Sequence, residues 1–75
     1  MKAVVWSKQD CVFCSQAKTL LLVKGIEFEE RKIGDGYTKE ELLAAVPTAR
    51  TVPQVILDGK LIGGYTELQS YLGKI

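Results

Sequence analysis

The apolar residues of this 75-residue chain fall into two spacings, one typical of helices and one typical of strands. The clearest helical spacing includes the run 15–24, which contains no Gly or Pro. Apolar side chains recur at i, i+4, i+7 and i+8, namely Phe13, Ala17, Leu20 and Leu21. The pattern predicts an amphipathic helix that begins near Cys11. We expect Gly25 to end this helix as a left-handed cap, because glycine adopts positive φ without steric cost.

Four short stretches predict strands. Residues 2–6 form a continuous, Val-rich apolar run, as in a central strand that is covered on both faces. Residues 26–33 begin with alternating apolar positions and then carry charge on both faces, which is typical of a protected edge strand. Residues 53–57 and 60–62 flank an Asp-Gly dipeptide, which readily adopts the positive φ angles of a two-residue turn. These last two stretches therefore predict a hairpin.

Two further helices are predicted from residues that cap a helix N-terminus. Thr38 followed three residues later by Glu41 has the spacing of a capping box, and this helix should end before Pro47. Thr66 and Gln69 have the same spacing. The expected buried residues of the first of these helices are Leu42, Leu43 and Val46. The last helix is expected to span 65–72 and to bury Leu68, Tyr71 and Leu72.

The resulting order, β-α-β-α-β-β-α, predicts an α/β fold with a four-stranded mixed sheet flanked by helices. Length and composition limit the chain to one domain, 1–75, of ordinary globular character, with 47% hydrophobic and 25% charged residues. A formal net charge of +1 does not point to a nucleic-acid partner. The apolar run 3–6 is too short for a secretory signal, and no stretch is long enough to span a membrane. We therefore expect a monomeric cytoplasmic protein that binds neither nucleic acid nor membrane.

Cys11 and Cys14 are the residues that carry the chemistry. In a cytoplasmic chain such a pair is more often catalytic or metal-binding than structural, and two cysteines without a histidine are too few to hold a metal. At the start of a helix, unpaired N–H groups and the helix dipole favour negative charge, so the Cys11 thiol should ionise readily. Cys14 falls on the same face as Ala17 and Leu21 and should be the more buried sulfur. We interpret the pair as a redox site.

Two charged neighbours act on Cys11 in opposite directions. The positive charge of Lys8 should lower the pKa of the Cys11 thiol, whereas the adjacent carboxylate of Asp10 would raise it. We expect Asp10 to serve instead as the N-cap of the helix, with its carboxylate held away from the sulfur. The alternative for Lys8, and also for Arg50, is a solvated surface charge.

Four motifs, in this order and spacing, resemble those of the glutaredoxins, small dithiol proteins of the thioredoxin fold. They are Lys8-x-x-Cys11-x-x-Cys14, Ala17-Lys18 with Leu20-Leu21, Thr51-Val52-Pro53, and Gly63-Gly64. The resemblance covers essentially the whole chain. Where the family usually has Cys-Pro-Tyr-Cys, this chain has Val12 and Phe13 between its cysteines. Where the family usually has Gly-Gly-Cys-Asp, Tyr65 and Thr66 replace the thiol and the carboxylate.

The resemblance implies a glutathione-dependent thiol-disulfide oxidoreductase with no tightly bound cofactor and no metal. Cys11 would attack a disulfide as the nucleophile, and Cys14 would then resolve the mixed disulfide. Glutathione would be the co-substrate, and the acceptors would be glutathione mixed disulfides and protein disulfides, including that of ribonucleotide reductase. The implied glutathione-binding residues are Lys8, Phe13, Arg50, Thr51, Val52, Pro53, Gly64, Tyr65 and Thr66.

The resemblance also implies how glutathione would lie. The Val52-Pro53 peptide would be cis and would leave the backbone of Val52 free to pair with an extended peptide. The glycine carboxylate of glutathione would meet Lys8 and Arg50. Its γ-glutamyl carboxylate would lie at the N-terminus of the last helix, where backbone amides favour anions, and Phe13 would wall the groove.

Two other functions remain open at this point. The first is a redoxin that takes electrons from thioredoxin reductase and serves ribonucleotide reductase alone; redoxins of that type carry a Trp-Ser-Gly-Phe segment, whereas Trp6 is the only tryptophan here. The second is a dimer that holds an iron-sulfur cluster through Cys11 of each chain and glutathione thiols. Relatives of that kind usually have small residues between the cysteines, whereas Val12 is bulky.

Overall fold

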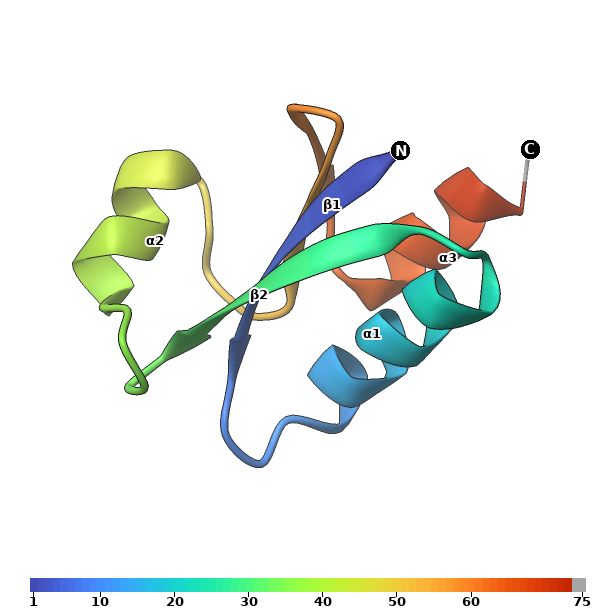
Figure 1. Cartoon of the computed structure of the whole chain (residues 1–75). Coiled ribbons are helices and arrows are strands. Elements are labelled where there is room, and N and C mark those ends of the chain that lie inside the picture. The colour runs from blue at the N-terminus through green and yellow to red at the C-terminus, as the bar shows by residue number, and fades with distance from the viewer. Residues whose placement is uncertain (74–75) are drawn as a thin grey trace.

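Within residues 1–73, the part of the chain that the computed structural model describes, four strands and three helices follow one another in the predicted order (Figure 1). They are β1 (Lys2–Lys8), α1 (Val12–Val23), β2 (Glu27–Ile33), α2 (Lys39–Ala45), β3 (Gln54–Leu57), β4 (Lys60–Gly63) and α3 (Tyr65–Leu72). None of these helices is long and apolar enough to cross a membrane.

The sheet of this described part has the strand order β2-β1-β3-β4 and is mixed, as predicted. β1 pairs in parallel with β2 and antiparallel with β3, and β3 and β4 form the antiparallel hairpin. Val5 of β1 lies between Glu30 of β2 and Val55 of β3. The parallel pair needs a crossover connection, which α1 supplies. β1 is therefore an interior strand and β2 an edge strand, which confirms both predictions.

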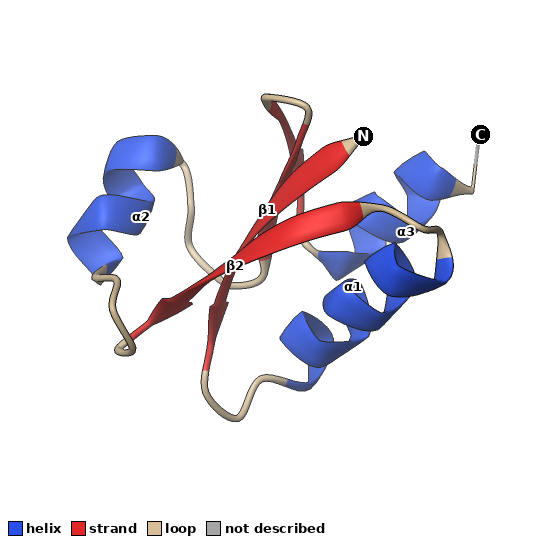
Figure 2. Ribbon diagram, viewed as in Figure 1, coloured by secondary structure: helices blue, strands red, loops and turns tan. Residues whose placement is uncertain are grey.

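Helices cover both faces of the sheet. Alternate residues of β1 point to opposite faces, so this strand contributes side chains to the core on each side. Ala3 and Val5 are fully buried in a core that they share with apolar residues of α1 and α3. Trp6 packs on the other side with Leu42 of α2 and with Val46. Figure 2 shows α1 and α3 together on one side of the sheet and α2 on the other. The two buried faces explain why the apolar run of β1 is continuous.

The C-terminus of α1 is a Schellman motif, which confirms the predicted glycine cap. Gly25 has a φ of +70°, and its N–H donates to the carbonyl of Leu22 at 3.0 Å. The N–H of Ile26 donates to the carbonyl of Leu21 at 2.9 Å. Ile26 and Leu21 also belong to the same core cluster, so hydrogen bonds and packing together fix the direction in which the chain leaves the helix.

The predicted capping box of α2 and the predicted hairpin turn are both present. Oγ1 of Thr38 accepts the N–H of Glu41 at 3.1 Å, and Oε1 of Glu41 accepts the N–H of Thr38 at 2.9 Å. Asp58 and Gly59 have φ angles of +49° and +80°, as a type I′ turn requires. Oδ1 of Asp58 also accepts the N–H of Lys2 at 2.9 Å, which ties the hairpin to the start of β1.

Two apolar side chains do not lie where the helical pattern predicts. Phe13 is 60% exposed and Leu43 is 37% exposed. A helix packed against a sheet buries only a narrow stripe, and in α1 that stripe consists of Cys14, Ala17 and Leu21. Phe13 and Leu43 instead line the hollows described in the next subsection.

β1 extends two residues beyond the predicted strand, and its added residue Ser7 is fully buried. The Ser7 hydroxyl donates to Oε2 of Glu30 at 2.7 Å. The same oxygen accepts the Lys18 ammonium group of α1, also at 2.7 Å. The hydrogen bonds from Lys18 and Ser7 hold the pKa of Glu30 below its usual value. This cluster joins β1, β2 and α1 next to the segment that carries the cysteines.

Glu30→Gln should lower the free energy of unfolding at pH 7 by about 0.5–1 kcal/mol, because the partly exposed ion pair with Lys18 is lost while an acceptor for Ser7 remains. A carboxylate with a depressed folded-state pKa stabilises the fold above its unfolded pKa, and this contribution is lost as pH falls through the folded pKa. The difference in the free energy of unfolding between wild type and variant should therefore be largest at pH 7 and should shrink below pH 4.5. Urea unfolding across this pH range measures it.

Glu29→Gln is the matched control, since Glu29 pairs with Arg31 at the surface and contacts no buried hydroxyl. We expect its effect on unfolding to be smaller than that of Glu30→Gln. A Glu30→Gln effect that is the same at every pH would contradict the assigned role of the ionised carboxylate.

Candidate active site

The sulfur of Cys11 caps the N-terminus of α1. Cys11 has extended backbone angles, and its Sγ accepts the N–H of Cys14 at 3.1 Å. The prediction that Asp10 is the N-cap is therefore wrong. Asp10 instead adopts a φ of +57° in the turn between β1 and α1, which places the next residue at the cap position. A backbone donor directed at the sulfur stabilises negative charge there, as does the positive end of the helix dipole.

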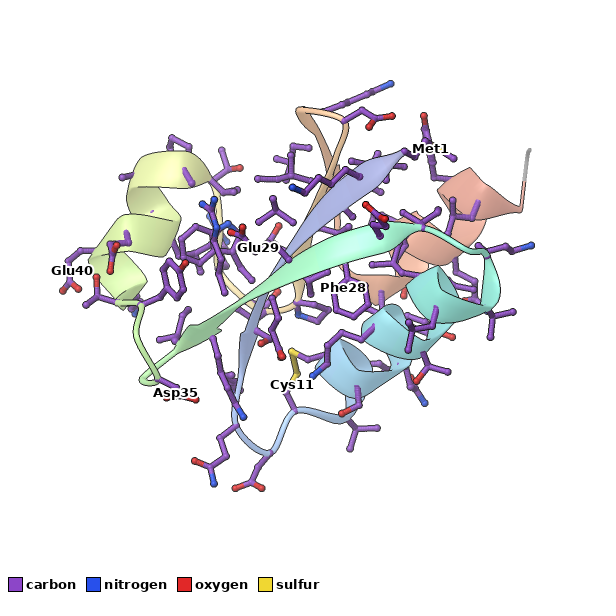
Figure 3. The ribbon with its side chains drawn as sticks, in the orientation of Figure 1. Met1, Cys11, Phe28, Glu29, Asp35 and Glu40 are labelled. Carbon is purple, nitrogen blue, oxygen red and sulfur yellow. A yellow bond between two sulfur atoms is a disulfide. The ribbon has the colours of Figure 1, made fainter. Side chains whose placement is uncertain are left out.

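Cys11 and Cys14 form a disulfide at the end of α1 (Figure 3). Cys14 is only 1% exposed and shares its face with Ala17 and Leu21, which confirms that it is the more buried sulfur. Cys11 is partly exposed. An incoming thiol or disulfide can therefore reach Cys11 but not Cys14.

The loop before β3 lies directly beside this disulfide. Sγ of Cys11 is 3.9 Å from the carbonyl oxygen of Val52. The Val52-Pro53 peptide is cis, as the resemblance implies. Within the described residues, neither the N–H nor the C=O of Val52 takes part in a backbone hydrogen bond. Val52 therefore offers a free backbone donor and acceptor next to the accessible sulfur.

A groove of about 310 Å³ runs from this loop to the start of α3. It is lined by Phe13, Thr51, Val52, Pro53, Gly64, Tyr65, Thr66 and Glu67. Seven of the nine residues predicted to bind glutathione are among them. The other two, Lys8 and Arg50, line a second hollow of about 550 Å³ on the α2 side, which Thr51 and Val52 also border. The structure thus brings the predicted residues to two adjoining hollows that meet at Val52.

Two aromatic side chains form one wall of the groove. The rings of Phe13 and Tyr65 stack with their centroids 6.2 Å apart and an interplanar angle of 28°. The contact joins the first turn of α1 to the first turn of α3. It explains the exposure of Phe13, because this side chain leaves the core to meet Tyr65. Both residues are among those predicted to bind glutathione, but the sequence gives no indication that their rings stack.

The N-terminus of α3 is capped differently from the prediction. Gly64 is the N-cap, and its N–H donates to Oε1 of Glu67 at 2.8 Å. Thr66 lies in the first turn and forms no capping box with Gln69, so that prediction is wrong. The reason is that Gly63 adopts a φ of +119°, which turns the chain so that the helix begins directly after Gly64. A cap at Thr66 would require the helix to begin two residues later. A Cβ at position 63 would lie 3.1 Å from the side chain of Glu67.

Glu67 is the site residue that sequence reasoning missed. Its carboxylate lies in the groove and occupies one of the helix-terminal amides, that of Gly64. The signal was present, because Glu67 follows Gly64 by the three residues of a capping box. The residue types alone favour Thr66 as the N-cap, because hydroxyl side chains are commoner caps than glycine.

Cationic side chains surround the disulfide. The surface hollow that contains Cys11 and Cys14 is also lined by Lys8, Lys18 and Lys32, with Asp10 as its sole carboxylate. Within the described residues, no three His, Cys, Asp or Glu side chains gather as a metal site would require. Because Lys18 is already paired with Glu30, Lys8 and Lys32 are the cations of this hollow that remain to favour a thiolate or an anionic ligand.

Residues 3–62 match the sequence model of the Glutaredoxin family. The chain belongs to the glutaredoxin family. Escherichia coli glutaredoxin 3 is 36% identical over 64 residues, which cover 85% of this chain and 77% of that protein. The structure of reduced Escherichia coli glutaredoxin superposes with a TM-score of 0.80 at 31% identity, over 99% of this chain and 95% of that one. For this glutaredoxin domain, membership assigns the Cys11 and Cys14 pair to thiol-disulfide oxidoreductase chemistry and confirms the thioredoxin fold.

Some relatives are longer than this chain. The hybrid peroxiredoxin hyPrx5 of Haemophilus influenzae is 43% identical over 67 residues, which cover 89% of this chain but 27% of that protein. A probable glutaredoxin of Synechocystis sp. is 40% identical over 89% of this chain and 62% of the relative. A buckwheat glutaredoxin, solved as its glutathione complex, superposes with a TM-score of 0.82 at 29% identity, over 96% of this chain and 68% of that one. The chain thus spans about a quarter of the length of the hybrid peroxiredoxin and just under two thirds of the length of the Synechocystis protein.

The reduced Cys14→Ser variant should develop its thiolate absorbance at a pH one unit or more below the ~8.5 of a free thiol. The reason is that the helix terminus and the backbone N–H at position 14 both favour the charged sulfur. Ultraviolet titration measures the transition. Adding Lys8→Met to the same variant separates the contribution of the lysine from that of the helix. A transition near ~8.5 in the single variant would exclude activation by the helix terminus.

Proposed function

We propose that this chain is a glutathione-dependent dithiol oxidoreductase that reduces protein disulfides and glutathione mixed disulfides. One observation carries the proposal: the accessible sulfur of Cys11 lies 3.9 Å from the carbonyl of Val52, whose backbone is free to pair with an extended peptide. Glutathione is a short extended peptide with a thiol at its centre and a carboxylate at each end. The buckwheat relative solved as its glutathione complex supports this choice of ligand.

Reduction of a disulfide would proceed in two exchanges. The Cys11 thiolate attacks one sulfur of the substrate disulfide, a new Cys11–substrate bond forms, and the other substrate sulfur leaves as a thiolate that takes up a proton. Cys14 then loses its proton and attacks Cys11, which releases the second substrate thiol and forms the protein disulfide observed here. The substrate gains two electrons and the protein loses two.

Glutathione would return the protein to its dithiol form. A first glutathione thiolate attacks the exposed Cys11 and releases Cys14, and a second attacks the mixed disulfide and leaves as glutathione disulfide. Val52 would pair with the cysteine of glutathione, and Lys8 with Arg50 would attract its glycine carboxylate. The γ-glutamyl group would lie at the start of α3, beside Phe13 and Tyr65. Glu67 already accepts one helix-terminal N–H there and offers its carboxylate to the γ-glutamyl amine.

The proposal includes the setting of the reaction. We place the protein in the cytoplasm as a monomer, with ribonucleotide reductase among the disulfide proteins it would serve. The redoxin that depends on thioredoxin reductase and the iron-sulfur dimer are the competing assignments. An assay with glutathione and glutathione reductase on a glutathione mixed disulfide distinguishes the proposed function from the first of them. A redoxin that depends on thioredoxin reductase would show no turnover in this assay. Anaerobic purification tests the second, since a cluster would give brown protein.

Cys11→Ser should abolish all turnover, whereas Cys14→Ser should retain reduction of glutathione mixed disulfides and lose most reduction of protein disulfides. The reason is that the first reaction needs one protein thiol, while the second needs a resolving thiol when the mixed disulfide is with a protein. The glutathione reductase coupled assay, run on both substrate types, measures the difference. Equal loss from the two substitutions on both substrates would contradict the roles assigned to the exposed and buried sulfurs.

A second acceptor class is favoured by the 43% identity to part of a hybrid peroxiredoxin. In that relative a matching segment belongs to the same chain as a peroxiredoxin. We propose that this chain reduces the oxidised cysteine of a separate peroxiredoxin.

With glutathione, glutathione reductase and a purified peroxiredoxin, this chain should support steady consumption of hydroperoxide, followed as NADPH oxidation. Omitting the chain or replacing it by Cys11→Ser should abolish at least about nine tenths of the rate, because the exposed sulfur starts each exchange. The Cys14→Ser variant is the informative comparison, since it reports whether the exchange needs one thiol or two. A rate unchanged by omission would exclude this acceptor while leaving the glutathione assay unaffected.

A further inference from the structure

The hollow on the α2 side extends well beyond the residues implicated in glutathione binding. It lies between α2 and the loop that precedes β3, and its volume of about 550 Å³ exceeds the 310 Å³ of the groove at α3. Its lining consists of Lys8, Ile33, Lys39, Leu42, Leu43, Ala49, Arg50, Thr51 and Val52. Glutathione has a single residue after its cysteine, so it accounts for only the part of this hollow next to Val52.

The rim of the hollow is positively charged. Lys8, Lys39 and Arg50 line it, and no carboxylate does. Within the described residues, none of these three cations has a carboxylate oxygen within 4.0 Å. Lys18 and Arg31 elsewhere on the molecule are each engaged in an ion pair. The charges at the hollow are therefore free to meet an external anion.

The floor of the hollow is apolar. Ile33, Leu42 and Ala49 belong to the core cluster on this face of the sheet. Leu43 adds a side chain that is 37% exposed and that the core does not use. A free small anion would gain nothing from such a floor, whereas a peptide that carries both acidic and apolar side chains would bury part of it.

The hollow is continuous with the redox site, and the charge changes sign along the way. Thr51 and Val52 border both the hollow and the groove at α3. At the α3 end the groove contains the carboxylate of Glu67, and at the α2 end the hollow contains its three cations. A peptide paired with Val52 therefore meets negative charge on one side of Cys11 and positive charge on the other.

The proposed function fixes the direction of such a peptide, and the present inference rests on it in this respect. The glycine end of glutathione points toward Lys8 and Arg50, so the chain direction of the ligand runs from α3 to α2. In an extended peptide each further residue advances by about 3.3 Å. Residues that follow the reactive cysteine of a protein substrate would continue past Arg50 toward Lys39 and Leu43.

We propose that the hollow lined by Lys39 and Leu43 is a docking site for the segment that follows the reactive cysteine in a protein disulfide, and that it selects acidic and apolar residues there. The exchange chemistry is unchanged. The hollow acts on which proteins are reduced quickly, because it contacts residues that glutathione lacks.

Symmetric disulfides of short peptides test this inference. One peptide has Cys-Asp-Leu-Glu, with the acidic residues after the cysteine; the second has the reversed order, Glu-Leu-Asp-Cys; the third has Cys-Lys-Leu-Lys. Reduced protein is mixed with each disulfide without glutathione, and the released peptide thiol is measured after an acid quench. We expect the first peptide to react about five- to tenfold faster than the other two at low ionic strength, with a smaller ratio in high salt.

Lys39→Glu should reduce the preference for the first peptide over the third by at least about threefold, and Leu43→Ser should slow the first peptide alone. Both variants should retain wild-type turnover of a glutathione mixed disulfide, because neither residue contacts glutathione in the proposed function. Lys24→Glu makes the same charge change at the far end of α1 and is the matched control. Thermal unfolding confirms that each variant is folded.

The outcomes separate this inference from the proposed function. Loss of glutathione turnover in the wild-type protein would defeat the proposed function itself. Normal glutathione turnover together with equal rates for the three peptides would overturn the docking site alone. An equal effect of Lys24→Glu and Lys39→Glu would also overturn it, since the preference would then come from the overall charge of the protein.

Discussion

The hydrogen bond from the N–H of Cys14 to the sulfur of Cys11 is the interaction on which the rest of the site depends. A helix N-terminus needs an acceptor for its first amides, and here that acceptor is the reactive atom. The same contact begins α1, directs one sulfur outward and stabilises the charge that the sulfur must carry. The second sulfur follows one turn later on the buried face, so the helical period alone makes one thiol accessible and the other sheltered.

This cap is held in place by an interior strand. β1 is paired on both sides and covered on both faces, and it delivers the chain to the cap through a three-residue connection between Lys8 and α1. The buried Ser7 hydroxyl, Glu30 and Lys18 tie the end of this strand to β2 and to α1 itself. The loop that carries Val52 is fixed by β3, which pairs antiparallel with the same strand. β1 therefore positions both the Cys11 cap and the Val52 loop. Because β1 lies in the close-packed core, the packing of the core fixes the distance between them.

Features decided by a few adjacent residues could be predicted from the sequence. The Asp-Gly hairpin turn, the glycine cap at Gly25 and the capping box at Thr38 depend on local backbone preferences, and the structure contains all three. The cysteine pair and its burial order depend on helical spacing, which is equally local. The order of the elements predicts the α/β class and the mixed four-stranded sheet, and the resemblance of four motifs to those of glutaredoxins implies the thioredoxin fold.

The two errors at the site concern the residue at which a helix begins. Asp10 was preferred to Cys11 as the cap of α1, and Thr66 to Gly64 as the cap of α3, because side-chain preferences rank oxygen acceptors first. In both places a residue with positive φ, Asp10 in one and Gly63 in the other, sets the entry of the chain and so shifts the cap. At α3 the helix start affects the site itself, because capping at Gly64 brings the carboxylate of Glu67 into the groove.

That carboxylate changes how the departures from the family pattern should be understood. Thr66 removes a negative charge where the family usually has aspartate, yet Glu67 supplies one from the next residue in the same turn. The groove therefore keeps an acidic end at α3 opposite the cations at α2, although the residue that carries it differs. A ligand that lies along Val52 with its amine toward α3 and its carboxylate toward α2 is matched in charge at both ends. The polarity therefore comes from Glu67 of α3 at one end and, at the other, from cations on β1, on α2 and on the loop before β3. These groups, and not the two sulfurs, distinguish one end of a bound ligand from the other.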